Sequence, residues 1–308
     1  MHLLIPFAAP LSDGGRHALT TLDLPQLAGL LSTAGAPVLD SADETSLSPP
    51  HERALARVLG LAGTDGGLPW AAWHAAQDGV NVASPPDLCW GLLTPGHWHL
   101  GTDQVTMLDP DELGLDEAAS RALLDAVHDL FESEGFLLVY GAPTRWYLAH
   151  ESLAQLATAS PDRVIGRNVD PWLPPSRDAR LWRRLQNEVQ MRLHTHPLNA
   201  AREAQGLLPV NSLWLSGCGV RQVPSRPEDL VVDDRLRRPA LAEDWATWLD
   251  TWRALDAGPV AALRGRSATL TLCGERTAAT WTLTPPGAWQ RLVARWRRTD
   301  VRALLEAL

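Results

Sequence analysis

Two pairs of histidines are the residues of this sequence with the most recognisable chemistry. His97 and His99 stand in the segment GHWH, and His194 and His196 stand in HTH. On a strand, the i, i+2 spacing puts both imidazoles of a pair on one face, where they could converge on a divalent metal. Neither pair has a clear acidic companion, and no histidine follows residue 196. We therefore expect structural or anion-contacting histidines and no cofactor, with a divalent metal as the alternative.

The segment from residue 194 to residue 219, HTHPLNAAREAQGLLPVNSLWLSGCG, gathers further polar candidates. An arginine offers bidentate contacts to phosphate, and the exposed amides of a Gly-Cys-Gly turn could cradle an anion and lower the thiol pKa. The LSGCG run lacks the G-x-S-x-G pattern of a nucleophile elbow, so no catalytic residue is identified; a turn that needs small residues is the plainer interpretation. The candidate ligand-binding residues are His194, His196, Asn199, Arg202, Asn211, Trp214, Ser216, Gly217, Cys218 and Gly219.

Length, charge and cysteine content limit the class of protein. The 308 residues are 45% hydrophobic, enough to bury a sizeable core in one large domain or two modest ones. A net charge of −9 argues against nucleic acid or an anionic membrane as the main partner. We expect no membrane span and no export signal, and therefore a cytoplasmic protein. Three cysteines without metal-type spacing predict reduced thiols.

Two biases in composition bear on mechanism. All 27 cationic residues are arginines, which excludes Schiff-base catalysis, a P-loop lysine and a lysine general base. The 14 tryptophans outnumber the three phenylalanines and two tyrosines, and their helical spacing near the C-terminus predicts core packing or partner contacts. Trp98 and Trp214 lie among polar residues and stay candidates for a site.

The hydrophobic pattern alternates between strand and helix periods, which predicts a layered α/β architecture. We expect strands over 2–8, 87–94, 103–108, 136–142, 145–150 and 210–217, and a hairpin over 267–283. We expect helices over 48–60, over 115–135 with Asp116 as N-cap, and over 180–196 ending before Pro197. Two C-terminal helices carry Trp245, Trp248 and Trp252, then Trp289 and Trp296.

The expected domain boundary is near residue 224. Residues 1–224 would form an α/β core with a small inserted lobe at about 95–150. Residues 225–308 would add the hairpin and the Trp-rich helices, packed on that core. The polar, proline-containing stretch 221–244 is the expected linker between the two parts.

Several long blocks resemble a known family. They are residues 47–60 (LSPPHERALARVLG), 92–113 (LLTPGHWHLGTDQVTMLDPDEL), 130–136 (LFESEGF), 162–174 (DRVIGRNVDPWLP), 183–191 (RRLQNEVQM) and 196–219. Together they resemble the RpfE-type regulatory proteins of proteobacteria, a family named for regulating extracellular enzymes and pathogenicity factors. That resemblance implies regulation and no established reaction.

The same blocks are more distantly similar to the archaeal-type cofactor-independent phosphoglycerate mutases. The matching positions are His196, Pro197, Asn199, Arg202, Gly206, Asn211, Leu213, Trp214, Leu215, Gly217 and Gly219. This resemblance implies an alkaline-phosphatase-like layered core with an inserted α+β lobe and an abbreviated C-terminal part. The mutases hold two metals, but residues 7–10 read Phe-Ala-Ala-Pro where they have a metal-binding Asp-Gly, and the later histidines are absent. The resemblance thus implies a scaffold that has lost its metal centre.

Three functions stay open at this point. The expected one is a non-catalytic regulatory or ligand-binding protein whose partner is a small anionic or phosphorylated metabolite or a regulatory protein. The second is a metal-dependent phosphoester mutase or hydrolase with an atypical site. The third is a protein-interaction module, which exposed tryptophans at 248, 289 or 296 would favour.

Overall fold

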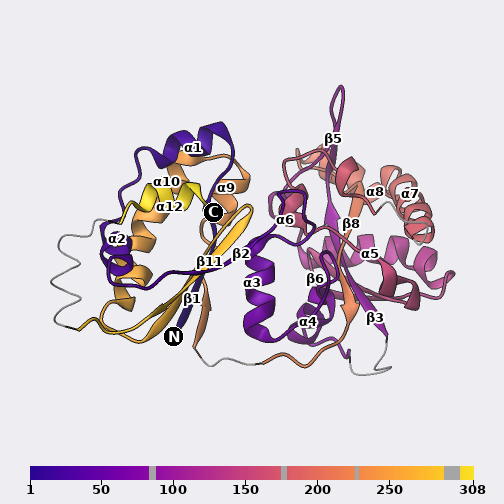
Figure 1. Ribbon diagram of the computed structural model, residues 1–308. Helices are drawn as coiled ribbons and strands as arrows, with labels where there is room; N and C mark the ends of the chain where they lie inside the picture. The colour runs from indigo at the N-terminus through magenta and orange to yellow at the C-terminus, as the bar shows by residue number, and fades with distance from the viewer. Residues whose placement is uncertain (83–87, 175–178, 226–228, 288–298) are drawn as a thin grey trace. The chain divides into compact units, whose positions relative to one another are not determined.

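The computed structural model describes residues 1–82, 88–174, 179–225, 229–287 and 299–308 (Figure 1). The chain divides into two compact units. Unit 1 contains Met1–Thr45, Pro49–Leu59 and Ser225–Leu308, and unit 2 contains Ser46–Ser48 and Gly60–Pro224. This grouping differs from the expected division into 1–224 and 225–308, because the N-terminal strand pairs with strands near the C-terminus.

Unit 1 is built on a five-stranded mixed sheet in the order β2-β11-β10-β1-β9. The central strand β1 (His2–Ala9) runs parallel to β10 (Ala268–Gly274) and to β9 (Leu230–Val232). The hairpin partner β11 (Thr277–Leu283) is antiparallel to β10 and to β2 (Val38–Ser41). The near-continuous apolar run of β1 fits a strand covered on both faces. The strand at 2–8 and the hairpin at 267–283 are confirmed.

Helices cover both faces of this sheet. On one face α3 packs Ala54 against Leu4 and Cys273, and Figure 1 shows α10 and α12 on the opposite side of the sheet from α3. The larger core on that opposite face includes the fully buried Trp248 and Trp252. The helices are α1 (Asp13–Leu19), α2 (Pro25–Leu31), α3 (Pro50–Leu59), α9 (Arg237–Leu241), α10 (Trp245–Leu255) and α12 (Val301–Glu306), with a π-helical turn η5 (Asp256–Val260) and a 3-10 turn η6 (Ala261–Leu263). The layers are those expected of an α/β fold.

Part of the stretch expected to be a linker, among its described residues, belongs to the sheet instead. Residues Leu230–Val232 are β9, which pairs with His2–Leu4 of β1, and α9 follows within the same stretch. Three apolar residues are too few to show an alternating pattern in the sequence. The open edge of β1 decides their conformation, because its backbone groups need partners.

Unit 2 has its own four-stranded antiparallel sheet in the order β6-β7-β3-β8. The strands are β3 (Cys89–Gly96), β6 (Leu137–Ala142), β7 (Arg145–Ala149) and β8 (Ser212–Val220), with a separate hairpin of β4 (Trp98–Leu100) and β5 (Val105–Met107). Residues 95–150, for which the sequence predicts an inserted lobe, lie within this unit, and the strands β6 and β7 among them share the sheet with β3 and β8.

The helices of unit 2 cover both faces of that sheet. Two amphipathic helices, α5 and α7, bury their apolar stripes in one core with the strands, and the alanines of α4 form a second core with Trp90 and Tyr147. The Asp116 carboxylate accepts the Ala119 N–H at 2.7 Å, which confirms the predicted N-cap. The helices are α4 (Trp70–Gln77), α5 (Glu117–Glu132), α6 (Pro161–Val164), α7 (Arg180–His194) and α8 (Pro197–Ala204), with 3-10 turns η1 (Pro110–Leu113), η2 (Glu151–Gln155) and η3 (Asp170–Trp172).

Two sequence expectations concern surfaces. In the part of the chain that the structure describes, no helix has the length and apolar character needed to cross a bilayer. Trp248 and Trp252 are fully buried, which counts against the Trp-rich interaction module. Trp289 and Trp296 lie outside the described residues.

Asp256 offers a test of how unit 1 is held together. Its side chain is 3% exposed and accepts the N–H groups of Leu27 at 2.7 Å and Gln26 at 3.0 Å, capping α2, which has no side-chain cap of its own. We predict that Asp256→Ala lowers the free energy of unfolding by about 2 kcal/mol in urea denaturation. The exposed Asp250→Ala in α10 is the control. A loss for Asp256→Ala no larger than that of the control would contradict this role.

Candidate functional site

Asn199 and Arg202, the most polar of the predicted ligand-binding residues, lie inside unit 2. Asn199 is 4% exposed, and its Nδ2 donates to the carbonyls of Leu193 and Val210, both at 2.8 Å. Its Oδ1 accepts the Val210 N–H at 2.9 Å. Both amide protons are therefore used within the protein. The side chain joins the end of α7 to the segment that precedes β8.

Arg202 is used in the same way. It is 5% exposed, its Nε donates to the Leu208 carbonyl at 2.9 Å, and its Nη2 donates to the Leu113 carbonyl. Burial lowers its pKa, because the charged form has lost water. The guanidinium joins α8 to η1 and does not present a free fork to a phosphate.

The two histidine pairs do not have the expected geometry. His194 is the last residue of α7 and His196 is the N-cap of α8, so this pair does not lie on one face of a strand; the helix expected over 180–196 does end before Pro197, which begins a new helix. The Nδ1 of His196 accepts the Leu198 N–H at 3.3 Å. His97 lies between β3 and β4 with Nδ1 2.9 Å from the Pro209 carbonyl oxygen, whereas His99 is an exposed residue of β4. Among the residues whose placement is described, no three His, Cys, Asp or Glu side chains gather as a metal site would need.

Asn211 and Trp214 fix the base of the β4–β5 hairpin and the strand beside it. The Asn211 side chain accepts the Trp98 N–H at 2.7 Å and donates to the Trp98 carbonyl at 2.9 Å. The Trp214 indole donates to the Ala159 carbonyl at 2.9 Å, and its ring lies 6.0 Å from that of Trp98. The contacts of Asn211 and of the Trp214 ring hold Trp98, at the base of the hairpin, beside the start of β8.

The Ser-Gly-Cys-Gly run serves close packing of α4 on β8. Gly217 has φ +61°, and a Cβ there would lie 2.9 Å from the Trp70 Cβ; a Cβ on Gly219 would lie 2.8 Å from Pro69. Ser216 is buried, and burial raises the pKa of the Cys218 thiol. The Gly-Cys-Gly amides therefore do not lower the thiol pKa as they could in an exposed turn, because burial disfavours the charged thiolate.

Unit 2 contains a group of titratable residues that the sequence did not predict. Asp78, after α4, accepts two hydrogen bonds from Arg145, at 2.9 and 2.8 Å, and one from the Tyr147 hydroxyl at 2.5 Å. The hydrogen bonds from Arg145 hold the Asp78 pKa below its usual value. Burial, with the nearby Arg145 charge, lowers the pKa of His74 to about 4. The group links α4 to β7. Because Asp78 lies far from Arg145 and Tyr147 in the sequence, no local pattern predicts that they meet.

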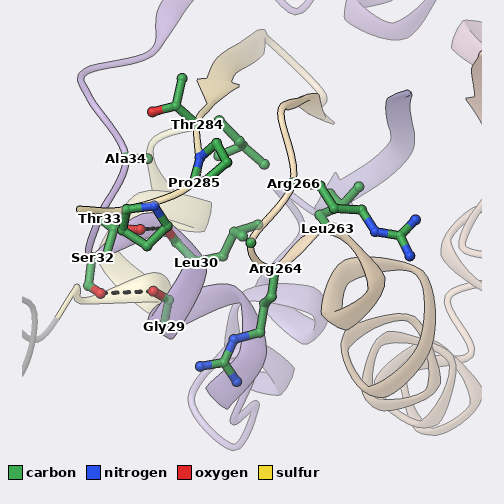
Figure 2. A pocket seen from close by; sticks show the side chains of 13 residues that line it. Gly29, Leu30, Ser32, Thr33, Ala34, Leu263, Arg264, Arg266, Thr284 and Pro285 are labelled. Carbon is green, nitrogen blue, oxygen red and sulfur yellow. Dashed lines mark hydrogen bonds between the residues drawn. The ribbon is translucent and has the colours of Figure 1, made fainter. Parts of the chain in front are cut away.

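A cavity of about 580 Å³ lies in unit 1 (Figure 2). Three segments meet there: the end of α2 with the residues after it, the turn between η6 and β10, and the end of β11. The lining residues are Gly29, Leu30, Ser32, Thr33, Ala34, Leu263, Arg264, Gly265, Arg266, Leu283, Thr284, Pro285 and Pro286. None of these residues is acidic.

The two arginines of this pocket flank a left-handed glycine. Gly265 has φ +71°, a conformation that side chains disfavour, and it separates Arg264 from Arg266 in a tight turn. The Arg264 guanidinium donates to the Gln26 side-chain oxygen at 2.9 Å. Figure 2 shows the two guanidinium groups pointing away from each other. The pocket is thus cationic, on a chain whose net charge is −9. The three segments that form the pocket lie too far apart in the sequence for a local pattern to predict that they meet.

No family model and no curated protein matches this chain. Among solved structures it is similar to the cofactor-independent phosphoglycerate mutase from Thermoplasma acidophilum DSM 1728, with 15% identity, a TM-score of 0.39 and 99% of each chain covered. It is also similar to the PH0037 protein from Pyrococcus horikoshii, with 12% identity, a TM-score of 0.42, and 94% of this chain and 92% of that one covered. Neither similarity assigns a role to a residue here.

We predict that Asn199 contributes to stability. Asn199→Ala leaves the carbonyls of Leu193 and Val210 and the Val210 N–H without their partner, and should lower the free energy of unfolding by about 3 kcal/mol. Asn187→Ala, on the exposed side of α7, is the control for urea denaturation. A stable Asn199→Ala variant with weakened anion binding would instead make Asn199 a ligand-binding residue.

The lowered pKa of His74 predicts a pH-dependent stability. The folded protein keeps His74 neutral down to about pH 4, whereas the unfolded chain takes up a proton below about pH 6.5. Protonation therefore favours the unfolded chain, and this contribution to stability is lost as the pH falls from 6.5 to 4. Between pH 6.5 and pH 4, the original protein should lose more unfolding free energy than the His74→Gln variant, by at most about 3 kcal/mol. Parallel pH profiles for the two proteins would contradict this assignment.

Proposed function

We propose that this protein binds a small anionic metabolite without transforming it, in the pocket flanked by Arg264 and Arg266. One observation supports this most: Arg264 and Arg266 both line the pocket, and its described lining residues include no carboxylate, on a chain with net charge −9. An anion is attracted to such a local reversal of charge, and a guanidinium offers it paired donors. A concave site with an apolar lining and few polar groups is typical of small-molecule binding.

The proposed binding site does not include Asn199 and Arg202, which the sequence suggested as ligand-binding residues. The side-chain donors of Asn199 and Arg202 are already bonded to backbone carbonyls. A ligand at that place would have to break those bonds, which leaves buried carbonyls without donors. Arg264 and Arg266 are exposed and can turn toward a ligand at much smaller cost.

The proposal includes a regulatory use of this binding. The blocks between residues 46 and 219 that resemble the RpfE-type family support regulation, and their similarity to the mutases supports an alkaline-phosphatase-like scaffold with a lobe at about 95–150. A cytoplasmic location belongs to the same proposal. The Phe-Ala-Ala-Pro at residues 7–10 offers no side-chain metal ligand, which supports binding without catalysis.

Isothermal titration of the full chain with 3-phosphoglycerate and with 4-phenylbutyrate tests this function. At least one of the two anions should bind, more weakly as salt increases, because added ions screen exposed charges. The Arg264→Gln, Arg266→Gln double variant should lose about tenfold or more in affinity, the effect of removing charge-assisted hydrogen bonds.

The control for this titration is Arg253→Gln, on the exposed side of α10 and outside the pocket. It should leave the affinity within about twofold of the original, since its exposed ion pair with Asp250 lies outside the pocket and contributes little. No binding of either anion, or equal binding by the double variant and the original protein, would refute the proposed function.

A further inference from the structure

We infer that the ligand of this pocket is an organic carboxylate with an apolar body, held by Arg266, and not a phosphorylated sugar. This inference rests on the proposed function and names the chemical class of its ligand. The side chains that line the pocket together with the two arginines support it. The lining is mostly aliphatic or without polar side-chain atoms: Leu30, Ala34, Leu263, Leu283, Pro285 and Pro286.

The polar part of the lining is a poor match for a polyhydroxylated ligand. Sugar hydroxyls are usually held by carboxylate or amide side chains, and the described residues of the lining include no Asp, Glu, Asn, Gln, His or Tyr. The Ser32 and Thr33 hydroxyls donate to the carbonyls of Gly29 at 2.8 Å and Leu30 at 3.0 Å, so their protons are already used. A sugar would lose more hydrogen bonds to water than the pocket returns. An apolar body loses none.

The arrangement of the arginines favours one carboxylate over a phosphate. The fork of one guanidinium pairs with two oxygens of a carboxylate or of a phosphate, but a phosphate has a third acceptor oxygen and up to two negative charges, which one fork does not satisfy. In Figure 2 the two guanidinium groups diverge, and Arg264 is held by Gln26. Within the described part of the chain, Arg266 makes no side-chain hydrogen bond or ion pair. It is therefore the group that a ligand can engage without displacing an existing partner.

The experiment compares three probes by isothermal titration with the full chain: 4-phenylbutyrate, acetate and 3-phosphoglycerate. Acetate has the carboxylate without an apolar body, and 3-phosphoglycerate has a carboxylate joined to a hydroxyl and a phosphate in place of the apolar body. We expect 4-phenylbutyrate to bind about tenfold or more tightly than either of the others, because it alone buries apolar surface against Ala34, Pro285 and Pro286.

Single variants separate the parts of the pocket. Arg266→Gln should weaken 4-phenylbutyrate binding about tenfold, and Arg264→Gln by less than about threefold. Thr284→Val removes the exposed hydroxyl but keeps the side-chain shape, and should leave the affinity unchanged. These side chains are exposed, so the variants should fold as the original protein does.

The outcomes distinguish this inference from the proposed function. Tighter binding of 3-phosphoglycerate than of 4-phenylbutyrate, lost in the double arginine variant, would overturn the apolar carboxylate but keep an anion-binding protein. A larger loss from Arg264→Gln than from Arg266→Gln would overturn the assignment of the anchor. If no probe binds, or binding is the same without both arginines, the proposed function fails together with the inference.

Discussion

The parallel pairing of β1 with β9 and β10 is the interaction on which the rest of unit 1 depends. A central strand covered on both faces must place its N–H and C=O groups in the sheet, because no water reaches them. The partners of His2 are Leu230 on one side and Thr269 on the other. This pairing brings the turn before β10 beside α2, which follows β1 in the chain. The cationic pocket is a consequence of that juxtaposition.

The two buried indoles of α10 stabilise an irregular point in the same strand. Phe7 has φ +56°, a left-handed conformation that costs free energy in a residue with a side chain, and the register of β1 shifts between Ile5 and Ala9. The indole N–H groups of Trp248 and Trp252 donate to the carbonyls of Phe7 and Ala8 at 3.1 and 3.0 Å. These bonds satisfy backbone groups at the irregular end of the strand. Tryptophan suits this position because it combines a large apolar ring with one donor.

Residues suited to anion binding can equally well satisfy the backbone of their own protein. Asn199 and Arg202 have the donors that a phosphate needs, but those donors reach carbonyls at the end of α7, before β8 and in η1. Residue type and spacing are the same in both cases, so the sequence could not separate them. The two arginines at 264 and 266 differ from Arg202 in exposure, which only the packing decides.

By itself the sequence determined the elements whose signals are local. The helices predicted over 115–135 and 180–196, the cap at Asp116 and the hairpin predicted over 267–283 are confirmed, with helices at 117–132 and 180–194 and strand pairing over 268–283, because neighbouring side chains dictate them. Tertiary structure decided the rest. It placed Leu230–Val232 in the sheet, divided the HTH segment between two helices, used Asn199 and Arg202 within the core and assembled the pocket from three distant segments. Each of these depends on contacts between residues far apart in the chain, whose burial and hydrogen bonding no local pattern encodes.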